Sequence, residues 1–186
     1  EYPPQSEVRQ RIQYRLTSAK DRIIAEIMLF YPVRNDLNLY LTYTDPERKT
    51  KSKNWLYIPP DETRNFARIK LNDFKTKGFI DKYITDPELP ETIDTALRTY
   101  IKNAKIQEDS PVFLATKQGM SDMNHRIIEI LGYSYLENGK NFWRRLAVSN
   151  MEWAVQNGLK TTEDKARLAM MMQHSNDAAS KSYLFP

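Results

Sequence analysis

The sequence predicts an α+β fold that is mainly α-helical, with a small antiparallel sheet near the N-terminal third of its 186 residues. Two observations support this prediction. Residues 37–44 alternate apolar and polar side chains, as half-buried strands do, and three more strand-like stretches follow before Pro90. After Pro90 the apolar residues recur mostly at helical spacing. A group of short strands followed by a run of helices therefore predicts a mainly helical α+β fold.

The composition permits a nucleic-acid partner without demanding one. The net charge is +4 and the pI is near 9.1, which is only mildly basic. The chain has no Cys, which excludes disulfides and thiolate metal sites, and its 2 His residues offer little material for zinc. No apolar run approaches the ~20 residues of a membrane span. We expect one domain without metal or cofactor, excised from a longer protein because the chain begins at Glu1.

Two helices are predicted before the sheet. The first is expected to be capped by Ser6 and to bury three residues at helical spacing, Val8, Ile12 and Leu16. The second is expected over residues 23–30, capped by Ser18 or Asp21 and ended by Pro32. This second helix is apolar on most sides, which places it in the core.

Four strands are predicted in succession, near residues 37–44, 55–58, 67–75 and 79–85. Lys77 and Gly78 lie between the last two, where Gly can supply the positive φ of a hairpin turn. We therefore expect these strands to form an antiparallel sheet with a hairpin at Lys77-Gly78.

The C-terminal half is predicted to be helical. Helices are expected over residues 92–102, from Ser121 onward, over residues 140–156, from Thr162 onward and over residues 178–183. Asn157-Gly158 is the signal that ends the third of these helices.

The stretch from Asn141 to Tyr183 contains side chains suited to phosphodiester chemistry. An arginine pair, Arg144 and Arg145, precedes His174, and Tyr183 lies nine positions after that histidine. Arginine can hold a phosphate through two parallel hydrogen bonds, histidine can donate to a phosphate oxygen, and tyrosine can act as a covalent nucleophile. Together they are the parts needed to attack a phosphodiester without a metal.

Each candidate also has an ordinary structural interpretation. Arg34 could be a turn arginine, Lys75 a hairpin lysine, Arg144 a charge on a helix surface, His174 a capping residue and Tyr183 a half-buried aromatic near a terminus. Their order along the chain is what favours a shared site.

With these residues in this order, the chain resembles the catalytic domain of the tyrosine recombinases, the phage-integrase family. Members carry an Arg after an apolar helix, a Lys in a β-hairpin, a His-x-x-Arg box, a His or Trp, and a Tyr nucleophile. The corresponding stretches here are L-F-Y-P-V-R-N-D with Arg34, L-N-D-F-K-T-K-G with Lys75, N-F-W-R with Arg144, M-Q-H-S with His174, and Tyr183 at the family's spacing. The likeness extends from about residue 23 to the end, and the forms around Arg34 and Lys75 look closer to integrases of large DNA viruses and eukaryotic mobile elements than to bacterial resolving enzymes.

The resemblance implies the recombinase catalytic-domain fold and a metal-independent reaction on double-stranded DNA. Tyr183 would form a 3′-phosphotyrosyl link, Arg34 and Arg144 would clamp the non-bridging oxygens with His174 as a further donor, and Lys75 would protonate the leaving 5′ oxygen. These groups should converge on one concave, positive surface. The resemblance also implies an intracellular, DNA-associated protein that forms a homo-oligomer, a tetramer, on DNA. A monomer is possible for this chain, which lacks the family's N-terminal core-binding domain.

Further cations are candidates for contacts to the DNA backbone. They are Arg9 and Arg11 in the first helix, Lys49, Lys51 and Lys53 in the polar loop after the first strand, and Lys77, Lys140 and Arg145. The alternatives are a solvated helix face for the arginines and a surface loop for the lysines.

The chain departs from the family at Asn141, where the box usually begins with His. Asparagine can donate a hydrogen bond but cannot exchange a proton near neutral pH, which puts general-base assistance in doubt. Lys70 and Lys77 are alternatives to Lys75, and Arg145 is the alternative to Arg144. The leading interpretation is an active recombinase or integrase. The alternatives are a catalytically impaired descendant that binds DNA as a structural module, and a type IB topoisomerase.

Overall fold

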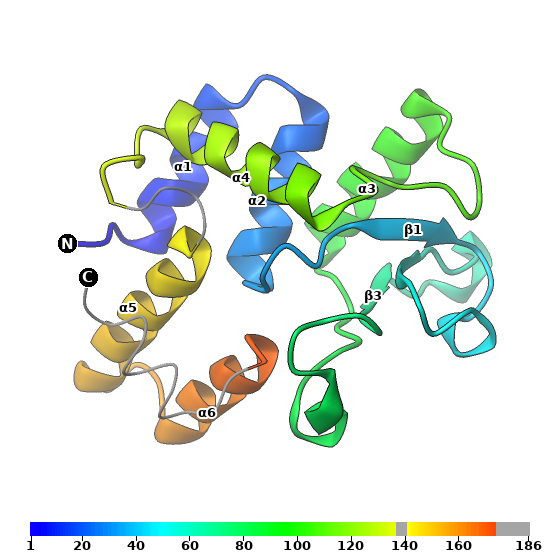
Figure 1. The fold of residues 1–186 in the computed structure, drawn as a ribbon. Helices are drawn as coiled ribbons and strands as arrows, with labels where there is room; N and C mark the ends of the chain where they lie inside the picture. The colour runs from blue at the N-terminus through cyan, green and yellow to red at the C-terminus, as the bar shows by residue number, and fades with distance from the viewer. Residues whose placement is uncertain (137–140, 174–186) are drawn as a thin grey trace. The chain divides into compact units, whose positions relative to one another are not determined.

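The computed structural model describes residues 1–136 and 141–173, which divide into two units (Figure 1). The helical unit comprises Glu1–Arg34, Asp81–Ile84 and the described residues from Asp122 onward. The sheet unit comprises Asn35–Ile80 and Thr85–Ser121. In the described part the fold is α+β, with about 52% helix, 6 helices and a 3-strand sheet. This confirms the predicted fold class at that level.

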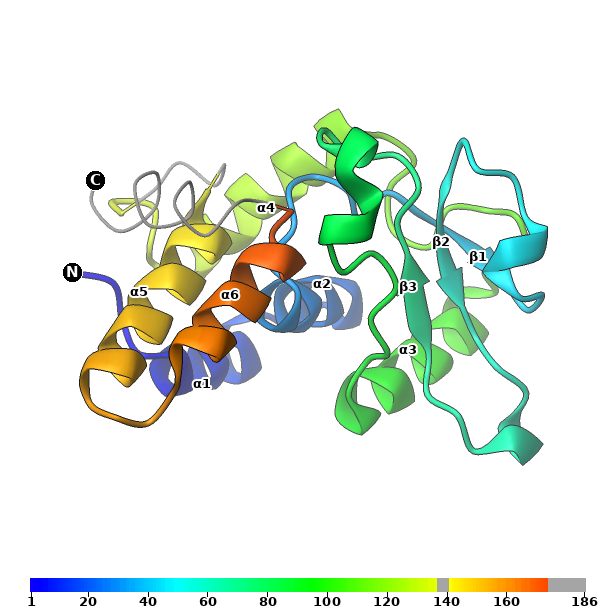
Figure 2. The same ribbon diagram turned by 90° about the horizontal axis from the view of Figure 1, so that it is seen from below.

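The helical unit contains α1 (Gln5–Arg15), α2 (Ala19–Phe30), α5 (Phe142–Gln156), α6 (Thr162–Met171) and most of α4 (Lys117–Leu131). α1 packs against α2, α2 against α5, and α5 against α6, the last pair lying side by side in Figure 2. The apolar residues that the sequence spaces at helical intervals are buried, among them Val8, Ile12 and Leu16 of the first helical stretch.

Three of the predicted helix boundaries are confirmed: the starts of α2 and α6 and the end of α5. The Ser18 hydroxyl caps α2 by accepting from the Asp21 backbone N–H. α5 ends at the C-cap Asn157, and Gly158 follows with φ 70°, a left-handed conformation that glycine adopts without strain. α6 begins with a capping box in which Thr161 and Asp164 bond each other's backbone N–H groups.

Two predicted caps are wrong. α1 begins at Gln5 directly after Pro4, so Ser6 lies inside its first turn. α4 begins at Lys117, so Ser121 lies within the helix. The Gly119 N–H donates to the Thr116 hydroxyl, so Thr116 and not Ser121 bonds the first turn of α4.

The sheet consists of β1 (Leu39–Thr42), β2 (Asn54–Tyr57) and β3 (Arg68–Lys70), in the order β1-β2-β3. β2 pairs antiparallel with β3 but parallel with β1, so the sheet is mixed and the prediction of an antiparallel sheet is wrong. The polar loop between β1 and β2, with a 3₁₀ turn over Pro46–Arg48, returns the chain to the same end of the sheet, as a parallel pair requires.

The predicted fourth strand is also wrong. Residues 79–85 fall mostly in a 3₁₀ segment, Lys77–Lys82, which replaces the predicted Lys77-Gly78 hairpin. The free edge of β3 is covered by residues 85–89: the Leu71 N–H donates to Thr85 O at 2.7 Å and the Ile69 N–H to Pro87 O at 3.1 Å. Pro87 accepts but cannot donate, which limits regular pairing there.

The side chain of Asn54, the first residue of β2, bonds the backbone just after β3 and so affects the position of Lys75. Its buried side chain accepts from the Asn72 and Asp73 N–H groups, both at 2.8 Å, and donates to Asp73 O at 3.0 Å and Asp36 O at 3.1 Å. These bonds turn the backbone away from the sheet. Lys75 is therefore exposed in the following turn, and its predicted place at the end of a hairpin strand is wrong.

The long helix of the sheet unit, α3 (Glu91–Ala104), buries Ile93, Leu97 and Ile101. Its Asp94 carboxylate accepts from the Ala67 N–H at 2.6 Å and from Arg98 in the next turn, which ties the helix to the residue before β3. The sheet unit thus has its own buried core and its own polar anchors.

Candidate functional site

Three of the predicted catalytic residues are described in the helical unit. Arg34 follows α2 and is half-buried, Asn141 directly precedes α5 and is half-buried, and Arg144 lies in the first turn of α5. Lys75 belongs to the sheet unit. His174, Tyr183 and Lys140 lie outside the described residues. The predicted convergence of Arg34, Lys75, Arg144 and His174 on one surface stays a prediction.

Arg144 is one of the most deeply buried side chains described, with 1% of its surface exposed. Its Nη1 donates to Pro32 O at 3.0 Å, and its Nη2 donates to Met172 O at 2.6 Å. Charged donors make short, strong bonds to carbonyls in a dry interior. Arg144 therefore links the start of α5 to the chain just after α2 and to the end of α6.

Those two carbonyls lie next to predicted site residues. Pro32 is two positions before Arg34, and Met172 is two positions before His174. Arg144 thus brings the main chain at Pro32 close to the main chain at Met172, although the two positions are widely separated in sequence. The sequence predicted these residues as a set but not the burial of Arg144.

A second polar cluster joins the same two segments. The Gln173 Nε2 lies 3.0 Å from Tyr31 Oη, 2.8 Å from Met171 O and 3.3 Å from Ile84 O, and the Tyr31 hydroxyl donates to Ile84 O at 2.5 Å. Tyr31 and Gln173 are both buried. Neither residue was predicted as part of a site. The only signals in the sequence were that Tyr31 precedes the Pro-Val-Arg turn and that Gln173 ends an apolar run.

Aromatic packing fixes the start of α5. Phe142 stacks on Tyr133 with ring centroids 5.4 Å apart and meets Trp143 edge-on at 5.2 Å. All three are buried, so the first turn of the helix is held in the core and Arg144 is held inward. The Tyr133 hydroxyl bonds the Glu7 carboxylate at 2.8 Å. Burial, and then that bond, raise the pKa of Tyr133 well above its usual range, so this tyrosine is a poor nucleophile.

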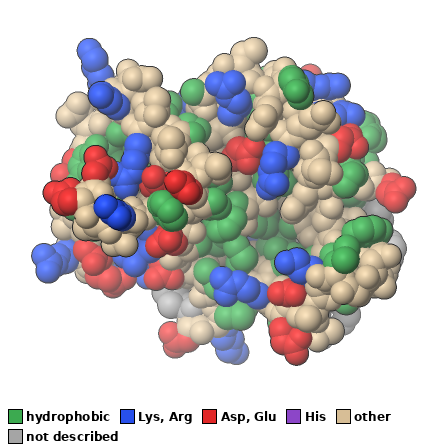
Figure 3. Space-filling model, turned by 180° about the vertical axis from the view of Figure 1, so that it is seen from behind, with side chains coloured by type: hydrophobic (Ala, Val, Ile, Leu, Met, Phe, Trp, Pro, Cys, Tyr) green, Lys and Arg blue, Asp and Glu red, His purple; other side chains and the backbone are tan. Residues whose placement is uncertain are grey.

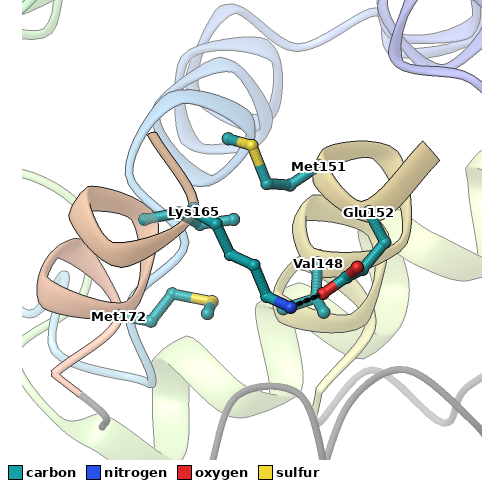
Figure 4. A pocket seen from close by; sticks show the side chains of 6 residues that line it. Val148, Met151, Glu152, Lys165 and Met172 are labelled. Carbon is teal, nitrogen blue, oxygen red and sulfur yellow. Dashed lines mark ion pairs between the residues drawn. The ribbon is translucent and has the colours of Figure 1, made fainter. Parts of the chain in front are cut away.

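A small pocket between α5 and α6 shows how α6 is held (Figure 4). Lys165 reaches from α6 to form an ion pair with Glu152 of α5. The apolar lining consists of Val148, Met151, Leu168 and Met172. Met172 is fully buried, so this contact holds the end of α6, whose Met172 carbonyl bonds Arg144.

The predicted DNA-binding arginines of α1 have partners within the helical unit. Arg9 lies 3.9 Å from the Glu26 carboxylate. Burial raises the pKa of that carboxyl group above its usual value. Arg11 pairs with Glu7 at 3.0 Å, lies over the Tyr133 ring and donates to Leu131 O at 2.9 Å. Since Leu131 ends α4, Arg11 satisfies a carbonyl at the negative end of that helix. Its contacts are therefore structural.

The loop lysines of the sheet unit are also engaged. Lys49 pairs with Asp109 at 3.0 Å, and that bond raises the pKa of Lys49. Lys51 pairs with Glu47, and Lys53 lies over the Tyr40 ring at 4.2 Å. The alternative hairpin lysine, Lys70, pairs with Glu47 as well, whereas Lys77 is exposed and Arg145 on α5 is half-buried.

The surface charge is mixed. On the face drawn in Figure 3, Lys and Arg side chains are interspersed with Asp and Glu. Contacts between the loop lysines and a phosphate backbone would require exchange of existing partners. Such an exchange costs little for the exposed Lys51–Glu47 ion pair.

The described ranges hold no group of three or more His, Cys, Asp or Glu side chains arranged to bind a metal. Within residues 1–136 and 141–173, none of the helices combines the length and the apolar character that crossing a membrane requires. Comparisons with protein-family models, curated protein sequences and solved structures found no match for this chain.

Proposed function

We propose that the chain is the catalytic domain of a tyrosine-type DNA recombinase or integrase, which cleaves and rejoins double-stranded DNA through a 3′-phosphotyrosyl intermediate. The support from the sequence is the ordered set from Arg34 to Tyr183 and its resemblance to that family. The support from the structure is one observation: Arg144 bonds the main chain beside Arg34 and the main chain beside His174.

That observation carries the proposal because the reaction needs these groups near one phosphate. A side chain extends only a few ångströms from its backbone, so residues on segments joined by one arginine can share a ligand the size of a phosphate.

In the proposed reaction the Tyr183 oxygen attacks the scissile phosphorus. The new P–O bond joins tyrosine to the 3′ phosphate, and the bond to the 5′ oxygen breaks. Lys75 supplies the proton that the leaving 5′ oxygen takes up, and the tyrosine proton passes to solvent or a neighbouring base. Arg34, Arg144 and His174 stabilise the charge that gathers on the non-bridging oxygens. The phosphodiester energy is conserved, so rejoining needs no nucleotide cofactor.

For Arg144 this role requires an exchange of acceptors. In the free chain its Nη1 and Nη2 groups donate to two carbonyls, and phosphate oxygens would have to take one or both places. An anion is a better acceptor than a neutral carbonyl, which favours the exchange once a phosphate is adjacent. Arg145 is the alternative clamp.

The test of the proposal is a nicked suicide duplex, which loses a short leaving strand after cleavage so that rejoining is blocked. A denaturation-resistant protein–DNA adduct is expected without added metal. Chelator should not reduce its yield. If a panel of duplexes gives binding but no adduct, the enzymatic proposal is wrong.

Asn141 provides a second test. It directly precedes α5 without capping it through its side chain, so the amide is not needed to begin the helix. Asn141→His should leave adduct formation intact or speed it, because it returns the family's usual group. Asn141→Ala should slow cleavage less than Arg144→Lys, since a neutral donor stabilises developing charge less than a guanidinium does. A larger loss for Asn141→Ala in single-turnover assays would show that the box is misregistered.

The burial of Arg144 favours a second candidate, a non-catalytic DNA-binding module. An arginine with 1% exposure that bonds two carbonyls already has a structural role, which would explain its presence without catalysis. This candidate predicts DNA binding that falls steeply with salt, because phosphate contacts release counterions, and no adduct on any duplex.

A further inference from the structure

We propose that the outer face of the sheet contacts the phosphate backbone of double-stranded DNA, and that Asp45 and Glu47 of the β1–β2 loop occupy phosphate positions on that face in the free chain. This inference rests on the proposed function, which supplies DNA as the partner. It comes from three features of the sheet unit: cations on one face of the sheet, the carboxylates that hold them, and an arginine whose hydrogen-bonding capacity is not filled.

The strand register gives the sheet two different faces, because successive residues of a strand point to opposite sides. The inner face carries one row of fully buried apolar residues across the three strands, Leu41, Leu56 and Ile69. The outer face carries two rows that each end in a cation on β3: Tyr40, Trp55 and Lys70, and Thr42, Tyr57 and Arg68. Figure 2 shows β3 beside β2. Lys70 and Arg68, both half-buried, therefore lie on the same side of β3.

Aromatic rings help to hold two cations on this face. The Lys53 Nζ lies 4.2 Å from the centroid of the Tyr40 ring, and the Arg68 guanidinium carbon lies 5.7 Å from that of Tyr57. A ring attracts a cation through its π face and uses none of the carboxylates. These two cations should therefore stay on the outer face when a carboxylate leaves it.

Carboxylates of the β1–β2 loop lie over the same face. The two oxygens of Glu47 pair with different lysines, one with Lys51 Nζ at 3.0 Å and the other with Lys70 Nζ at 3.3 Å. Bonds from Lys51 and then Lys70 hold the pKa of Glu47 below its usual value, so this carboxylate is charged at neutral pH. A backbone phosphate also presents two charged oxygens, so it can replace Glu47 between these lysines.

Arg68 favours the same exchange. It lies 3.7 Å from Asp45, which is longer than a hydrogen bond. Its Nε is buried and has no hydrogen-bond acceptor within the part of the chain that the structure describes. Charge and the Tyr57 ring thus hold the guanidinium without filling its donors. A phosphate in place of Asp45 would supply charged acceptors for the planar guanidinium fork.

The exchange should cost little and should leave the loop in place. The Asp45 and Glu47 side chains are both more than half exposed, and exposed ion pairs contribute little to stability. The loop is also held to the sheet by a bond that involves neither carboxylate, from Trp55 Nε1 to Thr50 O at 2.9 Å. Release of the two carboxylates therefore uncovers the cations without unfolding the loop.

The experiment measures the affinity of the chain for an intact DNA duplex by fluorescence anisotropy at several salt concentrations. Glu47→Gln removes the charge of the competing side chain and keeps its shape. The matched control is Glu62→Gln, which removes the same charge from an exposed glutamate of the sheet unit, in the 3₁₀ turn Asp61–Thr63. Lys70→Gln and the Glu47→Gln/Lys70→Gln double variant complete a double-mutant cycle.

Glu47→Gln should tighten DNA binding about threefold, the scale of one exposed ion pair, and Glu62→Gln should tighten it less. Lys70→Gln should weaken binding and reduce the slope of log affinity against log salt by about 1, because one phosphate contact is lost. In the Lys70→Gln background the gain from Glu47→Gln should shrink. Equal gains from Glu47→Gln and Glu62→Gln would show an effect of net charge alone and would overturn the inference. A gain that is the same with and without Lys70 would overturn it as well.

The suicide duplex, with the wild-type chain, tests the proposed function separately. If an adduct forms while Glu47→Gln and Glu62→Gln bind equally well, the inference fails and the proposed function stands. If no adduct forms while the gain is specific to Glu47 and depends on Lys70, the catalytic proposal fails and the DNA-contacting face stands. Absence of binding to every duplex would overturn both.

Discussion

The Tyr183→Phe chain is expected to bind double-stranded DNA as tightly as the wild-type chain and to form no covalent adduct. The substitution removes the Tyr183 hydroxyl, whose oxygen is the nucleophile in the proposed reaction. A phenol with pKa ~10 is mostly protonated at neutral pH, so neighbouring cations must favour its ionised form during attack. The measurement is the yield of denaturation-resistant adduct on the suicide duplex beside a binding isotherm on an intact duplex.

Tyr135→Phe is the matched control, because Tyr135 is 77% exposed and removal of its hydroxyl should change neither binding nor adduct yield. Mass spectrometry of the proteolysed adduct identifies the linked residue. Nucleotide on another residue, or an adduct that survives in Tyr183→Phe, would show that Tyr183 is not the nucleophile.

Arg144→Ala is expected to lower the free energy of unfolding by about 3 kcal/mol, because it leaves the carbonyls of Pro32 and Met172 buried without this donor and opens a cavity. A buried acceptor without a partner costs about 1–3 kcal/mol. The loss should appear in urea denaturation monitored by circular dichroism. An arginine whose only role is to bind an external phosphate would show no such loss.

The control for this prediction is Arg167→Ala. Arg167 is exposed on α6, the helix whose end Arg144 holds, and its replacement should change the free energy of unfolding by no more than about 0.5 kcal/mol. Equal effects of the two substitutions would contradict the structural role assigned to Arg144. Arg144→Lys should fall between them, since an ammonium lacks the planar fork that reaches two acceptors at once.

Features that depend on local pattern could be predicted from the amino-acid sequence. Apolar residues at helical spacing identified α1, α2, α3 and α5, and Ser18 and Asn157-Gly158 marked real helix ends. Alternation located β1, and the stretch from residue 55 located β2. These predictions succeeded because periodicity and capping act within a few residues along the chain.

The pairing of the segments and the hydrogen-bond partners of the polar side chains could be learned only from the folded structure. Strand pattern does not encode the direction of the neighbouring strand, so the parallel pairing of β1 and β2 was not foreseen. The end of β3 depends on Asn54, because the Asn54 side chain accepts from the backbone N–H of Asn72, 18 residues further along the chain. Arg144 was expected to face a phosphate, yet its bonds reach Pro32, 112 residues away, and Met172, 28 residues away. A guanidinium satisfies carbonyls and phosphates with the same donors, so only the distances between segments determine which acceptor it meets in the free chain.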